Sequence, residues 1–144
     1  MDVSVKGEYA LRAVFDLAGR DAPGPVKIAD IAQRQEIPQK FLELILAQLK
    51  KGGFLESRRG ADGGYFLAQP ATEITIGAVL RHIEGSLSPG RKMYRNGSPE
   101  NSPFPEFWNQ VEQALSGVID KTTFADLVER WREKNTHRAA NWEI

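Results

Sequence analysis

The stretch 36–68 constrains the fold most, because a bounded helix pattern leads directly into a glycine-rich turn. Pro38 suits the first turn of a helix, where its missing N–H would have no partner anyway. Leucine and isoleucine then recur at three- and four-residue spacing until Gly52 and Gly53, and glycine is typical of a helix end. The pattern predicts a helix over about residues 38–51.

A short β-hairpin follows the predicted helix. The runs FLESR (54–58) and YFLA (65–68) have the composition of two strands, and GADGG (60–64) supplies glycines that tolerate positive φ. A phosphate-binding P-loop would end in Lys-Ser/Thr and lead into a helix, and this segment does neither. We therefore interpret it as a hairpin that carries charge out to a partner; the alternative is a charged hairpin with no partner.

Further helix patterns surround this unit. Apolar residues at helical spacing predict helices over 5–19, 27–35 and 76–84, and Thr75 is a suitable cap for the third. The resulting order of helix, helix–turn–helix and β-hairpin is that of a winged helix-turn-helix. We place this DNA-binding type of domain in residues 1–85.

The segment 86–103 is rich in serine, proline, glycine and asparagine. Loops of this length are uncommon inside small domains unless they are functional or disordered. We therefore expect a flexible linker or an effector loop here.

A long helix with an apolar face is predicted over about 104–120, and a shorter one over 124–134 with Trp131 among its inward residues. The apolar face of the first is too extensive for an isolated appendage, and a second copy of the chain is the simplest cover for it. We interpret 104–134 as dimerisation helices and 135–144 as a frayed tail. The candidate dimerisation residues are Phe107, Trp108, Val111, Leu115, Val118 and Ile119.

The predicted fold class is therefore mainly α with a small β-hairpin. It consists of a winged helix-turn-helix followed by a long C-terminal dimerisation helix.

Composition excludes several classes of site. The 144 residues contain no cysteine and only two histidines, which excludes disulfides, thiolate nucleophiles and cysteine-bound zinc or iron–sulfur clusters. We find no nucleophile–base pair, metal-ligand set or phosphate loop, so we expect neither an enzyme nor a bound cofactor. The apolar runs are too short to span a membrane and the N-terminus does not resemble a secretory signal, so we expect a cytoplasmic protein with no membrane partner.

Charge is balanced over the whole chain but not locally. Lysine plus arginine and aspartate plus glutamate both total 19, which gives a formal net charge of zero. Between residues 50 and 59, however, there are four cations, Lys50, Lys51, Arg58 and Arg59, and only one acid, Glu56. A local cluster of cations is the electrostatic feature that nucleic acids require.

A winged helix places its third helix in the major groove of duplex DNA and its hairpin near the backbone or minor groove. Glu43 in the first turns of that helix could accept a hydrogen bond from a cytosine amino group, and Gln39 could read an adenine. The alternative is that these are ordinary solvated polar residues. An arginine beside the narrow hairpin tip suits an electronegative minor groove. The candidate DNA-binding residues are Lys6, Lys27, Gln39, Lys40, Glu43, Lys50, Lys51, Arg58, Arg59 and Gly60.

Three stretches resemble the Rrf2 family of bacterial transcription regulators: KGEYALRAVFDLA, IADIAQRQEIPQKFLELILAQLKKGGFLESRRGADGGYFLA and ITIGAVLRHIEG. The likeness is strong over 1–85 and continues through FWNQVEQALSGVIDKTTFADLV, and RGADGGY is close to the family's RGPGGGY. The resemblance implies a homodimer on a palindromic operator, with Glu43 as a base reader and Arg59 in the minor groove. Pro38 and Lys40 stand where the family often has small hydroxyl residues, which leaves the base preference open.

The chain departs from the family in the loop GSLSPGRKMYRNGSPENSPFPEF. Cluster-binding members carry three cysteines there, whereas this loop offers serine, asparagine and proline, which are poor iron ligands. A thiolate-held cluster is therefore excluded for this chain. The loop has two possible roles. It could form part of a pocket for a small-molecule or protein effector, which Met93, Tyr94 and Trp108 would line, or it could be a simple spacer.

Two functions follow from the sequence. The leading hypothesis is a sequence-specific regulator of transcription, a repressor, whose partners are double-stranded DNA and a second copy of itself. The alternative is a protein-interaction module that keeps the winged-helix scaffold without reading DNA.

Overall fold

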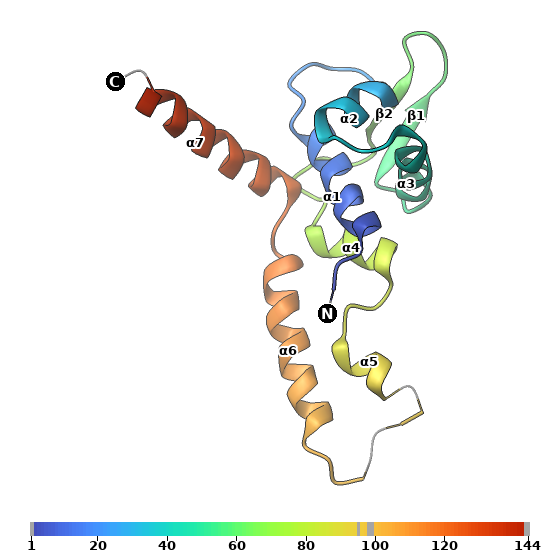
Figure 1. Cartoon of the computed structure of the whole chain (residues 1–144), viewed down its shortest axis with the longest axis vertical. Helices are drawn as coiled ribbons and strands as arrows, with labels where there is room; N and C mark the ends of the chain where they lie inside the picture. Colours follow the sequence, from blue (N-terminus) through green and yellow to red (C-terminus); the bar gives the residue numbers. More distant parts are fainter. Residues whose placement is uncertain (1, 95, 98–99, 143–144) are drawn as a thin grey trace.

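The computed structural model describes residues 2–94, 96–97 and 100–142 and shows a winged helix-turn-helix joined to a helical column (Figure 1). The winged domain contains α1 (Val5–Ala18), α2 (Ile28–Gln35), α3 (Gln39–Lys51), β1 (Leu55–Arg58), β2 (Gly64–Leu67) and α4 (Ile76–Glu84). Beyond it lie α5 (Pro89–Met93), α6 (Phe104–Ile119) and α7 (Phe124–Trp142). The predicted fold class is confirmed.

The core forms where α1, α3 and α4 meet. Ala10 and Ala13 of α1 are fully buried, and their small side chains allow the neighbouring helices to approach closely. From α3 the core receives the residues that the periodicity predicted, Leu42, Ile45, Leu46 and Leu49. Because α3 turns these four inward, its opposite face is left to solvent.

A polar contact holds α2 against α1. The carboxylate of Asp16 accepts hydrogen bonds from Arg34 Nε at 2.9 Å, from Arg34 Nη2 at 2.8 Å and from Gln35 Nε2 at 3.1 Å. The hydrogen bond to Asp16 raises the pKa of the Arg34 guanidinium, while burial acts in the opposite direction. The helix-turn-helix is thereby fixed to the rest of the domain at a defined angle.

The hairpin is also anchored. Its strands pair antiparallel, with Leu55 opposite Leu67 and Arg58 opposite Gly64. Val26 and Tyr65 exchange two backbone hydrogen bonds of 2.8 Å, which attach β2 to the segment between α1 and α2. The tip therefore extends from a base that is fixed next to the start of α2.

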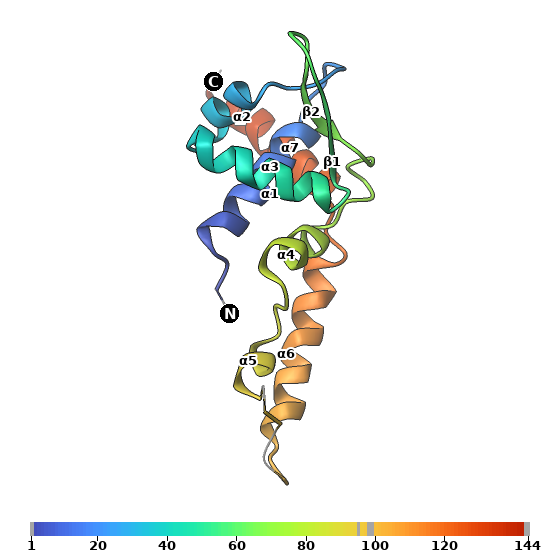
Figure 2. The same ribbon diagram turned by 90° about the vertical axis from the view of Figure 1, so that its right-hand side faces the viewer.

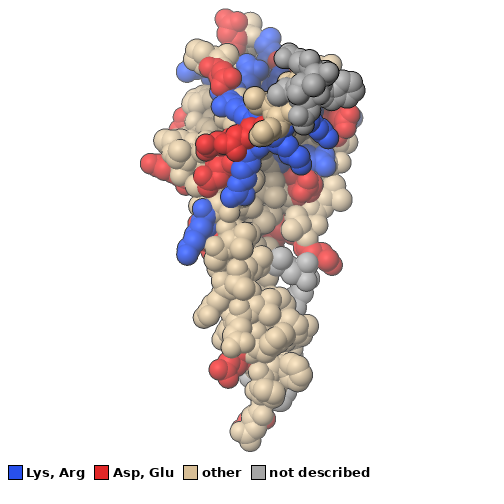
Figure 3. Space-filling view, turned by 90° about the vertical axis from the view of Figure 1, so that its left-hand side faces the viewer, with Lys and Arg blue, Asp and Glu red and all other residues tan. Residues whose placement is uncertain are grey.

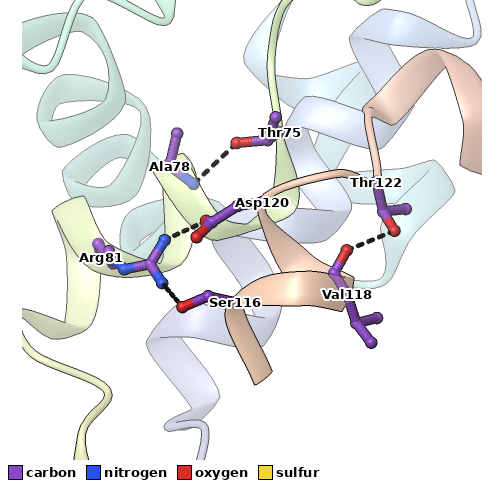
Figure 4. Close-up of polar contacts among 7 residues, drawn as sticks. All are labelled: Thr75, Ala78, Arg81, Ser116, Val118, Asp120 and Thr122. Carbon is purple, nitrogen blue, oxygen red and sulfur yellow. Dashed lines mark hydrogen bonds and ion pairs between the residues drawn. The ribbon is translucent and has the colours of Figure 1, made fainter. Parts of the chain in front are cut away.

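The column of α6 runs away from the winged domain beside α5 (Figures 1 and 2). Arg81 of α4 contacts the carboxylate of Asp120 and donates to Ser116 Oγ at 3.0 Å (Figure 4). Leu115 and Ile119 pack against the core at the same end. These contacts join the upper part of α6 to the domain and leave the rest of the helix extended.

Two C-terminal predictions were wrong. α7 continues to Trp142, whereas a helix end at 134 and a frayed tail were expected; the described part of that segment contains no glycine or proline that would stop a helix. Trp131 was expected to point inward but is 55% exposed, and its ring packs edge-to-face with that of Phe15 at 6.1 Å between centroids. Residues 143–144 of the predicted tail lie outside the described residues.

The segment 86–103 is not loop throughout, since α5 forms within it. Among the described residues, no helix combines the length and apolar character needed to cross a bilayer.

Candidate nucleic-acid interface

Helix α3 lies across one side of the molecule, and the hairpin rises beside its C-terminal end (Figure 2). Gln39, Lys40 and Glu43 are exposed on this helix, as base-reading residues must be. Lys51 is exposed as well, and Lys50 donates from Nζ to Ser57 Oγ at 2.6 Å, which links α3 to β1. Helix and hairpin therefore form one continuous surface.

The two arginines of the hairpin occupy different places. Arg58 belongs to β1, and its guanidinium lies over the Phe66 ring at 5.7 Å from the centroid. Arg59 follows the last strand pair and is exposed next to Gly60, whose φ of 109° starts the tip. Arg58 is thus held on the strand, whereas Arg59 projects from the turn.

A hollow of about 530 Å³ separates the hairpin from the N-terminal ends of α2 and α3; we call it the wing hollow. It brings together five candidate residues from three separate segments of the sequence. These are Lys27, Gln39, Arg58, Arg59 and Gly60. Lys27 is also the N-cap residue of α2 and makes no side-chain capping bond, and Ile28 and Ala29 line the hollow behind it.

The start of α1 is a separate place. Lys6 is half-buried there, and the carboxylate of Glu84 accepts from Ser4 Oγ and from the Ser4 backbone N–H, the latter at 3.2 Å. Ser4 Oγ in turn accepts from the Gly7 backbone N–H at 3.0 Å. The chain's own carboxylate therefore occupies this helix end, which disfavours a phosphate on the amides near Ser4; a DNA contact by Lys6 stays a prediction.

Two apolar residues of α3 were missed by the sequence analysis. Leu44 is 64% exposed, and Phe41 is exposed beside it with its ring edge-on to Tyr9 at 5.6 Å between centroids. They border a groove of about 520 Å³ between α1 and α3, which we call the apolar groove; its lining is Val5, Tyr9, Pro38, Lys40, Phe41 and Leu44. The available signal was a leucine at a position where the helical period predicts a polar residue.

Residues 3–130 match a family model described as "Iron-dependent Transcriptional regulator", Rrf2. The chain belongs to the Rrf2 family. The HTH-type transcriptional regulator IscR of Serratia proteamaculans is 35% identical over 130 residues, which cover 89% of this chain and 79% of that protein. The HTH-type transcriptional regulator CymR of Bacillus subtilis is 34% identical over 127 residues, which cover 88% of this chain and 89% of that protein.

Solved Rrf2-type structures agree with this assignment. CymR, the global cysteine regulator of B. subtilis, superposes with a TM-score of 0.78 at 32% identity, covering 90% of this chain and 98% of that chain. T. potens IscR gives a TM-score of 0.78 at 36% identity, covering 93% of this chain and 90% of that chain. This Rrf2-family chain is therefore a DNA-binding transcription regulator of the winged helix-turn-helix type, and the family model and both relatives are described as transcriptional regulators.

The residues of this Rrf2-family chain do not fit the iron site that the family description suggests. The sequence has no cysteine for an iron–sulfur cluster. Within the described part of the chain, no three histidine, aspartate or glutamate side chains gather closely enough to hold a metal ion. We therefore derive no regulatory step through iron.

A hollow of about 370 Å³ lies between α5 and α6 instead. Tyr94 and Trp108, two of the three residues considered as lining for an effector, line it together with Glu112 and Ser88, and an effector role for this hollow stays a prediction. Met93, the third candidate, is 62% exposed and is not part of the lining.

The candidate dimerisation residues occupy the length of α6. Phe107 and Val118 are exposed and the other four are half-buried; within the described chain, no residue of α6 is buried. Figure 3 shows that the lower column, where Figure 1 places α6, carries few charged side chains on this face. The helix therefore presents apolar side chains that the chain itself does not cover.

Proposed function

We propose that the chain acts in the cytoplasm as a homodimeric repressor that binds a palindromic operator. The observation that carries the proposal is the wing hollow, because it joins three exposed cations to the first turn of α3. Such a surface combines phosphate binding with access to base edges, and specific DNA binding needs both.

The start of α2 offers a seat for a DNA phosphate. Without a side-chain cap from Lys27, the first N–H groups of α2 lack a side-chain acceptor, and Ile28 and Ala29 line the hollow. A helix N-terminus with free N–H groups favours an anion, and Lys27 and Arg58 add positive charge on either side. A phosphate bound here positions the duplex against α3 and the wing.

With a DNA phosphate bound at the start of α2, α3 enters the major groove and the wing points toward the minor groove. Glu43 then meets base edges, where a carboxylate suits the amino group of cytosine. Arg59, which is not paired within the hairpin, enters the narrow groove, whereas Arg58 stays over Phe66.

Dimerisation through α6 explains why this helix of 16 residues leaves Phe104, Phe107 and Val118 exposed. Two copies related by a twofold axis present two α3 helices, so the operator is expected to be a palindrome whose half-site spacing reports the dimer geometry. A dimer bound across a promoter blocks transcription by occupying it, and a promoter–reporter assay tests this sign of regulation.

Selection of bound duplexes from a random pool, with the purified full chain, tests the proposal. We expect an enriched palindrome, an affinity that falls steeply with salt, and a loss of about 5- to 150-fold for Glu43→Ala or Arg59→Ala. The matched control is Glu56→Ala, which removes an exposed carboxylate from β1 outside the wing hollow and should keep the preference for the palindrome.

Different failures have different meanings. If no motif is enriched, the protein-interaction module becomes the better hypothesis. If a motif is enriched but neither Glu43→Ala nor Arg59→Ala weakens binding to it, the docking geometry is wrong.

A further inference from the structure

Leu44 is the most exposed large apolar side chain of α3. Burial of a leucine from water is favourable by about 1.5–3 kcal/mol, so such a residue gains most when a partner covers it. Leu44 shares one side of α3 with two lysines. It follows Lys40 by four residues and precedes Lys51 by seven, and this spacing places the three side chains on one ridge of the helix. This ridge lies opposite the buried residues of α3.

Only one base carries an apolar group in the major groove. Thymine presents its C5-methyl group there, whereas the other base edges present hydrogen-bond donors and acceptors. We propose that Leu44 contacts a thymine methyl group in each operator half-site, beside the base that Glu43 reads. The inference rests on the proposed function and adds a second specificity residue to it.

Three observations favour DNA over another occupant of this surface. Lys40 and Lys51 lie on both sides of Leu44 along the ridge, and their charge suits the phosphates that border the major groove. Glu43 lies three residues after Lys40 and is therefore its neighbour on the helix surface, so the ridge borders the proposed base-reading face. The apolar groove, bordered by Phe41 and Leu44, offers an almost wholly apolar wall toward which a methyl group can pack.

The test uses deoxyuridine in place of thymine, because this change removes the methyl group and keeps every hydrogen-bonding group of the base. Each thymine of the selected operator is replaced in turn, and affinity is measured with the full chain. We expect one symmetric pair of positions to lose about fourfold per half-site, or roughly 15-fold when both are replaced, as burial of a single methyl group implies.

The variant Leu44→Ala should bind the thymine and deoxyuridine operators equally. Met93→Ala is the matched control, since Met93 is 62% exposed but lies on α5, and it should retain the full difference. Glu43→Ala should also retain the thymine–deoxyuridine difference while losing its own base preference.

Two results would overturn the inference while leaving the proposed function intact. One is an enriched palindrome in which no thymine responds to deoxyuridine. The other is a thymine response that persists in Leu44→Ala. A change in oligomeric state on Leu44→Ala, measured by analytical ultracentrifugation, would assign the ridge to self-association instead. Failure to enrich any duplex would count against the proposed function itself.

Discussion

Replacing Asp16 with asparagine tests how the helix-turn-helix is held against α1. The Asp16 side chain is 4% exposed and accepts three hydrogen bonds, two from Arg34 and one from Gln35. Asparagine has nearly the same shape but removes the charge and turns one acceptor oxygen into a donor that faces the guanidinium. The substitution therefore isolates the electrostatic contribution of the contact from its packing.

The expected loss in the free energy of unfolding depends on how exposed Asp16 and Arg34 are. Breaking a buried ion pair costs about 3–5 kcal/mol when the remaining charge stays buried, and a hydrogen bond to a charged group is worth about 1.5–3 kcal/mol. The Arg34 side chain is 41% exposed, so water can solvate the guanidinium after the change. We expect a loss of about 2 kcal/mol in the free energy of unfolding, which corresponds to roughly 6 °C in Tm.

Urea-induced unfolding followed by circular dichroism measures the loss, and one fixed protein concentration makes the proteins comparable even where the proposed dimer contributes to stability. The matched control is Glu8→Gln on the same helix, which breaks the exposed pair between Glu8 and Arg12 at 3.2 Å. Exposed pairs of this kind contribute little, so we expect a change below about 0.5 kcal/mol. If Asp16→Asn is as mild as this control, the contact does not hold the helix-turn-helix in place.

Two further predictions concern the wing and α7. Gly64→Ala should expose the hairpin to proteolysis and weaken DNA binding more than Gly60→Ala does. A Cβ at Gly64 would lie 2.3 Å from the Val26 carbonyl oxygen, whereas a Cβ at Gly60 would meet no atom within 4 Å. Equal effects of the two substitutions on proteolysis and DNA binding would contradict this prediction. Asp126 accepts from the Thr123 backbone N–H at 2.9 Å, which lowers the pKa of the carboxyl group. Its contribution to stability is therefore present above about pH 4, the ordinary aspartate pKa, and is lost as the pH falls through the lower folded value. Acid unfolding of Asp126→Asn should thus show a flatter dependence below pH 4 than the native chain, and identical curves would refute the assignment.

Local signals account for the parts of the fold that the sequence predicted. Pro38, Gly52 and the glycines of the tip delimit α3 and the hairpin within a few residues, and the period of α3 separates its buried leucines from exposed Glu43. The end of α7 was predicted too early, at residue 134. No glycine or proline marks a helix end in its described residues, so the sequence offered no local signal for where the helix stops.

Contacts between distant segments could not be predicted. The wing hollow depends on the backbone bonds between Val26 and Tyr65, which bring Lys27 beside Arg59. The carboxylate at the start of α1 belongs to Glu84, 80 residues away from Ser4. Leu44 departs from the helical period of the buried leucines of α3, but the period alone does not show what its side chain would contact; its 64% exposure in the folded chain makes it a candidate contact residue.

The zero net charge of the chain bears on how it selects its site. Attraction to phosphates supplies most non-specific DNA binding, and in the proposed docking five of the candidate cations lie in the wing hollow or on the ridge of α3, namely Lys27, Lys40, Lys51, Arg58 and Arg59. The two proposed base readers add nothing to that attraction, because Leu44 is neutral and Glu43 has the same sign as DNA. On an unmatched sequence, Glu43 loses water without gaining a donor, and Leu44 faces polar base edges. The penalty at the wrong site therefore adds to the specificity that the contacts at the right one provide, so Glu43→Ala should weaken binding to the operator while strengthening binding to unrelated duplex.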